Sequence, residues 1–186
     1  MKNVGFLDIE TKKLFSDVGG YFPEKLGLAI AGVLVDGVAY LFCEEEIQNL
    51  FKLLDKLDLI AGHNLFFFDY KVLQPYANFD VRVKYEGKTV DTLAEIEKIT
   101  GIRMSLDNLC MINFNTGKNG HSIEIPGLWA EGKRDMVIGY LKNDLYLSKM
   151  LFEAGLKGKI KVSINGELKE IKPGWAVRTN GLLSGP

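Results

Sequence analysis

The sequence is poor in cysteine, and the little it has gives no sign of a disulfide framework. Its 186 residues include two cysteines, Cys43 and Cys110, and each lies among apolar neighbours. Two free, buried thiols are therefore favoured over a disulfide or a pair of metal ligands.

Long apolar runs are missing as well. No stretch of the sequence approaches the ~20 apolar residues that a membrane-spanning helix needs. The residues after Met1 lead directly into a strand-like pattern, without the charged and apolar regions of a signal peptide. We therefore expect no membrane partner and a cytoplasmic location.

Neither sign of charge dominates. The net charge of −1 argues against a protein that coats nucleic acid by charge alone. Residues 1–154 hold 17 Lys and Arg against 22 Asp and Glu, whereas residues 155–186 hold 6 against 2. The basic side chains near the C-terminus either follow a phosphate backbone or form a solvated face. They are Lys157, Lys159, Lys161, Lys169, Lys172 and Arg178.

Strand-like and helix-like patterns alternate along the chain. Strands are predicted over residues 3–9, 27–35, 38–43, 59–61, 159–164 and 167–172, with Asp36-Gly37 and Asn165-Gly166 as hairpin turns. Helices are predicted over 45–57, from Asn64 to near Pro75, over 92–99, over 105–112 with Ser105 as the cap, and over 134–154. The Asn- and Gly-rich residues 113–127 are predicted to form a mobile loop.

This order predicts an α/β fold, in which a mixed β-sheet is flanked by helices and followed by a C-terminal β-hairpin. The length suits one substantial domain. We assign residues 1–156 to that domain, 157–175 to a hairpin extension packed on it, and 176–186 to a flexible tail.

Four acids lie in otherwise hydrophobic elements. Asp8 and Glu10 alternate on one strand and so share a face, while Asp69 and Asp144 fall in predicted helices. Any one of them alone is more often a helix cap or a solvated strand end. Together they suggest a site for Mg²⁺ or Mn²⁺, because buried carboxylates must be neutralised and these ions prefer oxygen ligands. Paired divalent ions commonly hydrolyse phosphodiesters.

Three motifs in order, "FLDIET", "HNLFFFD" and "YLKND", resemble the exonuclease motifs of the DEDD superfamily. That superfamily includes polymerase proofreading domains and has an RNase H-like fold. Tyr140, four residues before Asp144, matches its tyrosine branch (DEDDy). The segments "SLDNLC" and "GLWAEGKRDMVIGYLKNDLYLSKMLFEAG", with "KPGW" after the hairpin, also resemble predicted 3′–5′ exonucleases associated with DEAD/DEAH-box helicases.

The resemblance implies a metal-dependent 3′–5′ exonuclease that hydrolyses single-stranded nucleic acid, with DNA favoured and a helicase as a candidate partner. It implies that Asp8, Glu10, Asp69 and Asp144 bind two divalent ions, and that Tyr140 orients the attacking water. An alternative from another class is a non-catalytic nucleic-acid-binding or helicase-partner module with the same fold. The sequence leaves the oligomeric state open.

Other residues near the motifs are also candidates for the site. Thr11, Asn64 and Phe66 are predicted to contact the substrate, although Asn64 is equally plausible as a helix cap. Core packing is favoured for at least two of the rings Phe66, Phe67 and Phe68, and the remaining ring would stack on a base. A structural role is favoured for His63. Asp91 either supports the metal ligands or caps the helix that follows it, and the cap is favoured. His121 is expected to be solvated.

Overall fold

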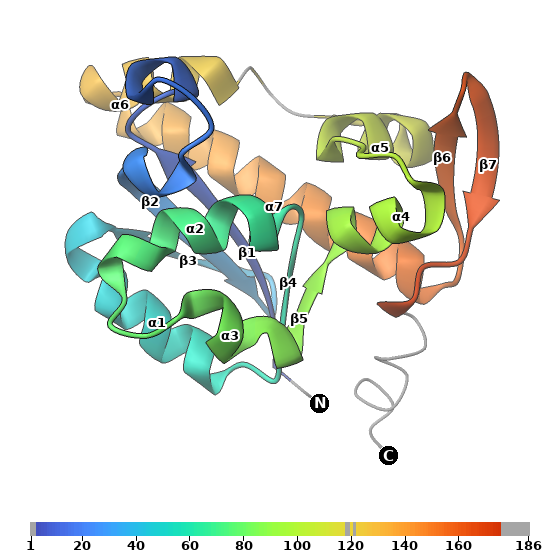
Figure 1. Ribbon diagram of the computed structural model, residues 1–186, viewed down its shortest axis with the longest axis horizontal. Coiled ribbons are helices and arrows are strands. Elements are labelled where there is room, and N and C mark those ends of the chain that lie inside the picture. Colours follow the sequence, from blue (N-terminus) through green and yellow to red (C-terminus); the bar gives the residue numbers. More distant parts are fainter. Residues whose placement is uncertain (1–2, 118–119, 121, 176–186) are drawn as a thin grey trace.

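The computed structural model describes residues 3–117, 120 and 122–175 (Figure 1). The strands are β1 Val4–Thr11, β2 Leu28–Val35, β3 Val38–Cys43, β4 Leu59–Gly62, β5 Thr89–Asp91, β6 Ile160–Ile164 and β7 Glu167–Ile171. The α-helices are α1 Ile47–Lys56, α2 Tyr70–Leu73, α3 Val81–Tyr85, α4 Thr92–Thr100, α5 Leu106–Phe114, α6 Ile125–Ala130 and α7 Arg134–Leu156.

Five strands form one mixed sheet in the order β3-β2-β1-β4-β5. β2 is antiparallel to both of its neighbours, β1 and β3, whereas β4 runs parallel to β1 and β5 runs parallel to β4. The turn between β2 and β3 places Asp36 and Gly37 both at positive φ, as the sequence predicts for a two-residue hairpin. β1 therefore lies in the middle of the sheet, where both of its edges are paired.

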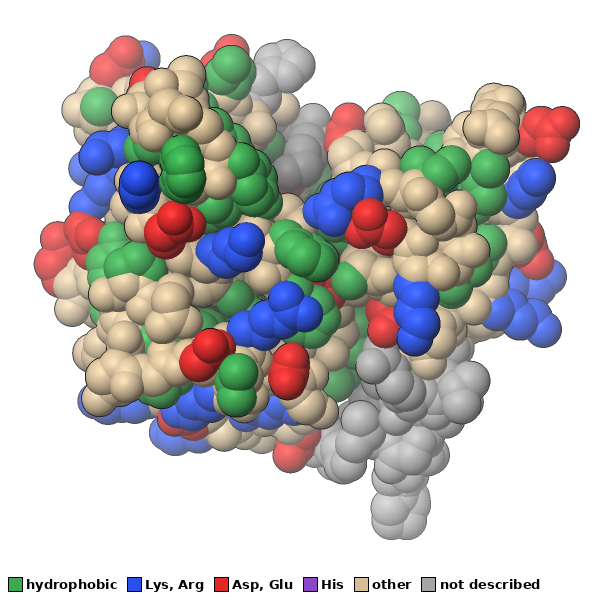
Figure 2. Space-filling view, viewed as in Figure 1, with side chains coloured by type: hydrophobic (Ala, Val, Ile, Leu, Met, Phe, Trp, Pro, Cys, Tyr) green, Lys and Arg blue, Asp and Glu red, His purple; other side chains and the backbone are tan. Residues whose placement is uncertain are grey.

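Helices cover both faces of the sheet, with α7 behind it and α1, α2 and α3 in front of it in the view of Figure 1. Alternation along β1 separates two hydrophobic cores: Phe6 packs with residues of α7, while Leu7 and Ile9 pack with residues of α1 and α2. On the face seen in Figure 2, Lys and Arg side chains are interspersed with hydrophobic ones over α2 and α3.

The C-terminal hairpin of β6 and β7 lies beside α5 (Figure 1), and its inner residues Ile160 and Val162 belong to the same core as α7. Trp175, just beyond the hairpin, is fully buried, stacks on Phe152 at 6.4 Å between ring centroids, and donates a hydrogen bond to the Phe152 carbonyl. Gly155 permits this contact, because a Cβ there would overlap the indole ring.

Trp175→Ala is expected to destabilise the protein by about 3–5 kcal/mol, since it removes a large buried ring and leaves a cavity. For a chain of this size the melting temperature should fall by roughly 6–20 °C. Thermal unfolding followed by circular dichroism measures the change, with Leu168→Ala on the exposed face of β7 as the control. Equal melting temperatures for the two variants would contradict this account of how the hairpin is held.

Most elements agree with the sequence predictions, within about two residues at each end. Three interpretations are wrong. Residues 113–127 are not one loop, because α5 extends to Phe114, a 3₁₀ turn spans Ser122–Glu124 and α6 begins at Ile125. Cys43 is only half-buried, although both cysteines are free and Cys110 is buried. The third concerns Asn64, whose side chain makes no capping hydrogen bond. The predicted tail 176–186 and Arg178 lie outside the described residues.

Candidate active site

Asp8 and Glu10 lie on the face of β1 that packs against α7. They continue the row begun by Phe6, and Glu10 is only 7% exposed. Asp8 pairs across the sheet with Gly32 of β2. A Cβ at Gly32 would lie 2.8 Å from Leu145 of α7, so the glycine allows that helix to approach the strand next to Asp8.

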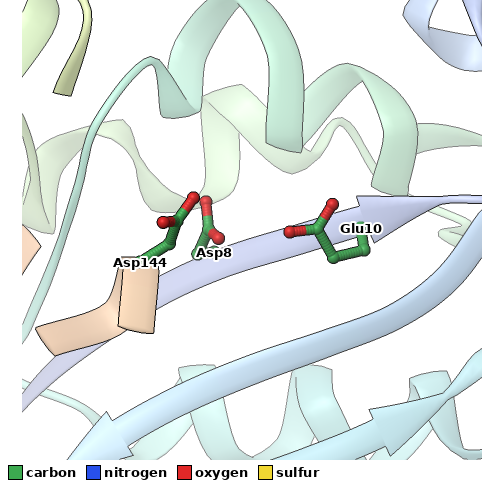
Figure 3. Close-up of side chains that lie close together, drawn as sticks. All are labelled: Asp8, Glu10 and Asp144. Carbon is green, nitrogen blue, oxygen red and sulfur yellow. The ribbon is translucent and has the colours of Figure 1, made fainter. Parts of the chain in front are cut away.

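α7 supplies the third acid and the tyrosine. Tyr140 and Asp144 are one turn apart on its buried face, with 5% and 2% exposure. One carboxylate oxygen from each of Asp8, Glu10 and Asp144 lies within 4.8 Å of the other two. Figure 3 shows the three side chains, with those of Asp8 and Asp144 adjacent. Two distant segments thus form one acidic cluster.

Asp69 lies in the connection between β4 and α2 and lines the same cavity as the other acids. It ends a π-helical turn, Leu65–Asp69, and is 2% exposed. Its Oδ1 atom is buried and accepts no hydrogen bond from the described part of the chain. Burial raises the pKa of the Asp69 carboxyl well above its ordinary value, and the nearby charges of Asp8, Asp91 and Glu10 raise it further.

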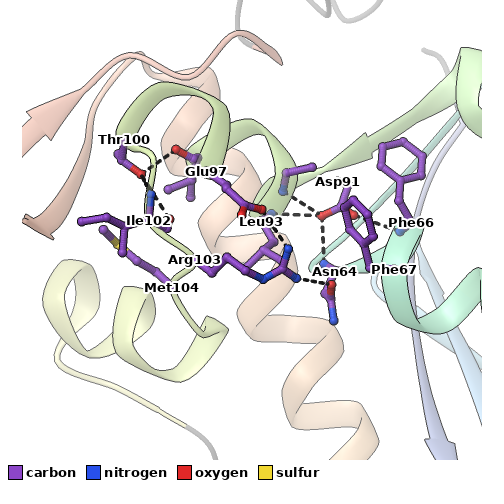
Figure 4. A network of polar contacts seen from close by, with 12 residues as sticks. Asn64, Phe66, Phe67, Asp91, Leu93, Glu97, Thr100, Ile102, Arg103 and Met104 are labelled. Atoms are coloured by element: carbon purple, nitrogen blue, oxygen red, sulfur yellow. Dashed lines mark hydrogen bonds and ion pairs between the residues drawn. The ribbon is translucent and has the colours of Figure 1, made fainter. Parts of the chain in front are cut away.

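The turn that carries Asp69 is held by Asp91 at the end of β5 (Figure 4). Asp91 accepts hydrogen bonds from the backbone amides of Leu93 and Ala94, which confirms it as the cap of α4. It also accepts bonds from the amides of Asn64 and Phe66, each at 2.9 Å. One buried carboxylate therefore fixes both the start of α4 and the turn before Asp69.

Asn64 does not cap a helix with its side chain. Its backbone is left-handed, with φ of 73°, and its side-chain oxygen instead accepts a hydrogen bond from Arg103 at 3.0 Å (Figure 4). The prediction of an N-cap is correct in position, because Asn64 directly precedes the π-helical turn, but wrong in chemistry, because its side chain accepts no hydrogen bond from that turn. The side chain faces the site instead.

The acids lie in a cavity of about 540 Å³. Its lining contains all five residues predicted to be catalytic and two of the three predicted substrate contacts, Thr11 and Asn64. Phe66 is not among the lining residues: it packs against the core on the α1 and α2 side, and Phe68 lines the cavity instead.

Of the two histidines, only His63 belongs to the described residues. Both ring nitrogens of His63 are hydrogen bonded to the protein, one to the Thr92 hydroxyl and one to the Met104 carbonyl, each at 2.9 Å. This arrangement fits the structural role favoured for His63. His121 lies outside the described residues.

Several lining residues have no signal in the sequence. Lys13 follows β1, Phe15 lies in the connection between β1 and β2, and Arg103 lies between α4 and α5. A single cation or ring in a connecting segment forms no motif, so only the folded chain shows that it faces the acids.

Comparison with solved structures finds the same architecture elsewhere. The chain is similar to the family B DNA polymerase from the hyperthermophilic archaeon Pyrobaculum calidifontis, with a TM-score of 0.64 over 84% of this chain and 17% sequence identity. The fold is RNase H-like. The chain spans about a quarter of the length of that polymerase (25%), and at this identity the likeness concerns the fold alone. No protein-family profile and no curated protein matches the sequence.

The acidic cluster fits a divalent metal site. Its candidate ligands are all carboxylates, which suit hard cations such as Mg²⁺ and Mn²⁺ better than softer metals. The buried Oδ1 of Asp69 and the raised pKa of that carboxyl are further signs of a position that a cation would stabilise.

None of the described helices is both long enough and apolar enough to span a membrane.

Proposed function

We propose that this protein is a metal-dependent 3′–5′ exonuclease of single-stranded nucleic acid, with DNA favoured as substrate, in the tyrosine branch of the DEDD superfamily. One observation supports it above all: Asp8, Glu10 and Asp144 bring carboxylate oxygens within 4.8 Å in a cavity that Asp69 and Tyr140 also line. These five residues occupy the motif positions of that branch. One similar solved structure is a DNA polymerase, and polymerase proofreading domains belong to the same superfamily.

The chain's own residues have distinct tasks in this reaction. Asp8, Glu10, Asp69 and Asp144 would hold two divalent ions. When bound, such ions supply an activated water and stabilise charge on the leaving 3′ oxygen. Tyr140 would orient the water, because a neutral phenol is a poor base on its own. Arg103 and Lys13 place positive charge at the cavity wall, where phosphate groups would lie.

The 3′ direction of cleavage leads to a prediction about the substrate. The protein should release mononucleotides from the 3′ end of linear single strands in Mg²⁺ or Mn²⁺. Duplex ends should react slowly because they must fray before one strand can enter the cavity, and a 3′-phosphate should slow the reaction strongly. End-labelled single-stranded, duplex and overhang DNA and RNA, resolved on sequencing gels, would measure this.

Closed circular single strands are the control for direction. If they are cut as fast as linear strands, the protein is an endonuclease and the proposal is wrong. If strands bind but neither metal supports cleavage, the chain is instead a non-catalytic binding module. The proposed helicase partner rests on the sequence resemblance alone, and a co-purification with DEAD/DEAH-box proteins would examine it.

A further inference from the structure

Five side chains form a connected surface at the edge of the cavity, here called the aromatic–cationic rim: Tyr21, Phe67, Lys71, Arg82 and Arg103, of which Arg103 also lines the cavity. The Tyr21 hydroxyl donates a hydrogen bond to the Phe67 carbonyl at 2.8 Å. The Lys71 ammonium lies 5.8 Å from the centre of the Tyr21 ring. The guanidinium groups of Arg82 and Arg103 lie 5.6 and 5.3 Å from the centre of the Phe67 ring. Rings and cations thus alternate along the rim.

Core packing does not account for the two rings of the rim. Phe66 and Phe68 pack against the core on the α1 and α2 side, whereas Phe67 and Tyr21 belong to neither core formed by the described residues. Tyr21 is 55% exposed. An exposed Tyr21 and a half-buried Phe67, contacted by cations and joined by a backbone hydrogen bond, indicate a binding surface rather than part of the hydrophobic interior.

The rim is continuous with the candidate active site. Arg103 lines the cavity and also contacts Phe67 of the rim. A second connection is aromatic: Phe15 and Phe68 line the cavity, with ring centroids 6.1 Å apart, and Phe15 stacks on Tyr21 at 4.7 Å. A chain that leaves the cavity on this side therefore meets rings and positive charges without interruption.

The charges of the rim remain available to an anion. Arg103 pairs with Glu97 at 2.8 Å and Arg82 approaches Glu86 at 3.8 Å. In both pairs the side chains are about a third to a half exposed. Ion pairs exposed to this degree are weak, so a phosphate can replace or share the acid. On the face that holds α2 and α3, Figure 2 shows Lys and Arg side chains next to hydrophobic ones, with acidic side chains among them.

We propose that the aromatic–cationic rim binds the nucleotides that precede the 3′ terminus of a single strand. This inference rests on the proposed function, because it takes the terminal nucleotide to lie in the cavity. Unpaired bases would take the place of the cations over Tyr21 and Phe67, whose rings tolerate any base, and Arg82, Lys71 and Arg103 would then bind phosphates. The bases of a duplex cannot stack on these rings, because they are already paired and stacked on one another.

The test measures binding without cleavage. Fluorescence anisotropy of labelled oligothymidylate and oligouridylate, in EDTA, is compared for the wild type and for Tyr21→Ala, Phe67→Ala, Arg82→Gln and Lys71→Gln. Each aromatic variant should weaken binding about 5- to 100-fold. Each cationic variant should reduce the slope of log affinity against log salt by about 0.7, the loss of one phosphate contact. The affinities for the two oligonucleotides show whether the protein prefers DNA or RNA.

Matched controls lie away from the rim. Tyr40→Ala removes a ring that is 46% exposed on β3, and Lys149→Gln removes a cation from the surface of α7. Both should bind strands as the wild type does, and circular dichroism would establish that every variant is folded. Wild-type affinity in the rim variants, or losses of equal size in the controls, would overturn the inference even if the protein cleaves 3′ ends. If the rim variants bind strands more weakly but the wild type cleaves no strand in Mg²⁺ or Mn²⁺, the rim is a strand-binding surface and the proposed exonuclease activity is wrong.

Discussion

Asp8→Asn is expected to lower single-turnover cleavage of a labelled single strand by about three orders of magnitude or more while the fold survives. Asparagine keeps the shape of the side chain but removes one negative charge from a cluster whose oxygens lie within 4.8 Å of one another. Bound cations typically contribute several kcal/mol of charge stabilisation to such reactions, and every 1.4 kcal/mol is worth tenfold in rate. Asp144→Asn should behave in the same way.

Thermal unfolding gives a readout of the same variant that does not depend on activity. Without divalent metal, Asp8→Asn should melt at the same temperature as the wild type or higher, because one like charge has left the cluster. Mg²⁺ or Mn²⁺ should raise the melting temperature of the wild type more than that of the variant, since a ligand that binds only the folded state stabilises it.

Asp135→Asn is the matched control for the two acid variants. It removes the same charge from the exposed first turn of α7, far along the helix from Asp144. It should leave cleavage and the response to metal unchanged. Full cleavage by Asp8→Asn, or by the wild type in EDTA, would contradict a metal-dependent mechanism.

The acidic cluster could be predicted from the sequence because its residues belong to elements with strong patterns. Asp8 and Glu10 interrupt a hydrophobic strand at alternate positions, and Asp144 falls on the buried face of a long amphipathic helix. Burial of a carboxylate costs folding free energy unless a cation or hydrogen bonds compensate its charge. An acid at a buried position of a regular pattern therefore stands out in the sequence as a candidate site residue. The long helix and the hairpins are predictable for the same reason, since each has a regular period and a turn with a known residue preference.

Other parts of the site depend on contacts between segments distant in sequence, which no local pattern encodes. β5 has only three residues and α6 begins in a segment rich in Gly and Asn, so neither shows a period. The sequence suggests the capping role of Asp91, but its bonds to the amides of Asn64 and Phe66 arise from the pairing of β4 with β5. Arg103 could not be assigned to the cavity for a similar reason.

Tyr140→Phe separates the tyrosine from the acids. The change keeps the ring, which is 5% exposed and packs in the core between α7 and the sheet, but removes the hydroxyl at the cavity. Positioning or acid–base groups contribute about 10²–10⁴-fold, so single-turnover cleavage should fall by that factor while strand affinity and melting temperature stay close to those of the wild type.

The size and the pattern of this loss carry the mechanistic information. Tyr146→Phe is the control, because it removes a hydroxyl from the same helix at a side chain that is 47% exposed and outside the cavity lining. It should cleave at the wild-type rate. If Tyr140→Phe does so too, Tyr140 serves only to pack α7, and the match to the tyrosine branch has no mechanistic meaning. If its strand affinity falls in parallel with its rate, the hydroxyl contacts the substrate and not the water. A slow rate at normal affinity is the result expected for a phenol that orients the water, with the four acids retaining a residual activity.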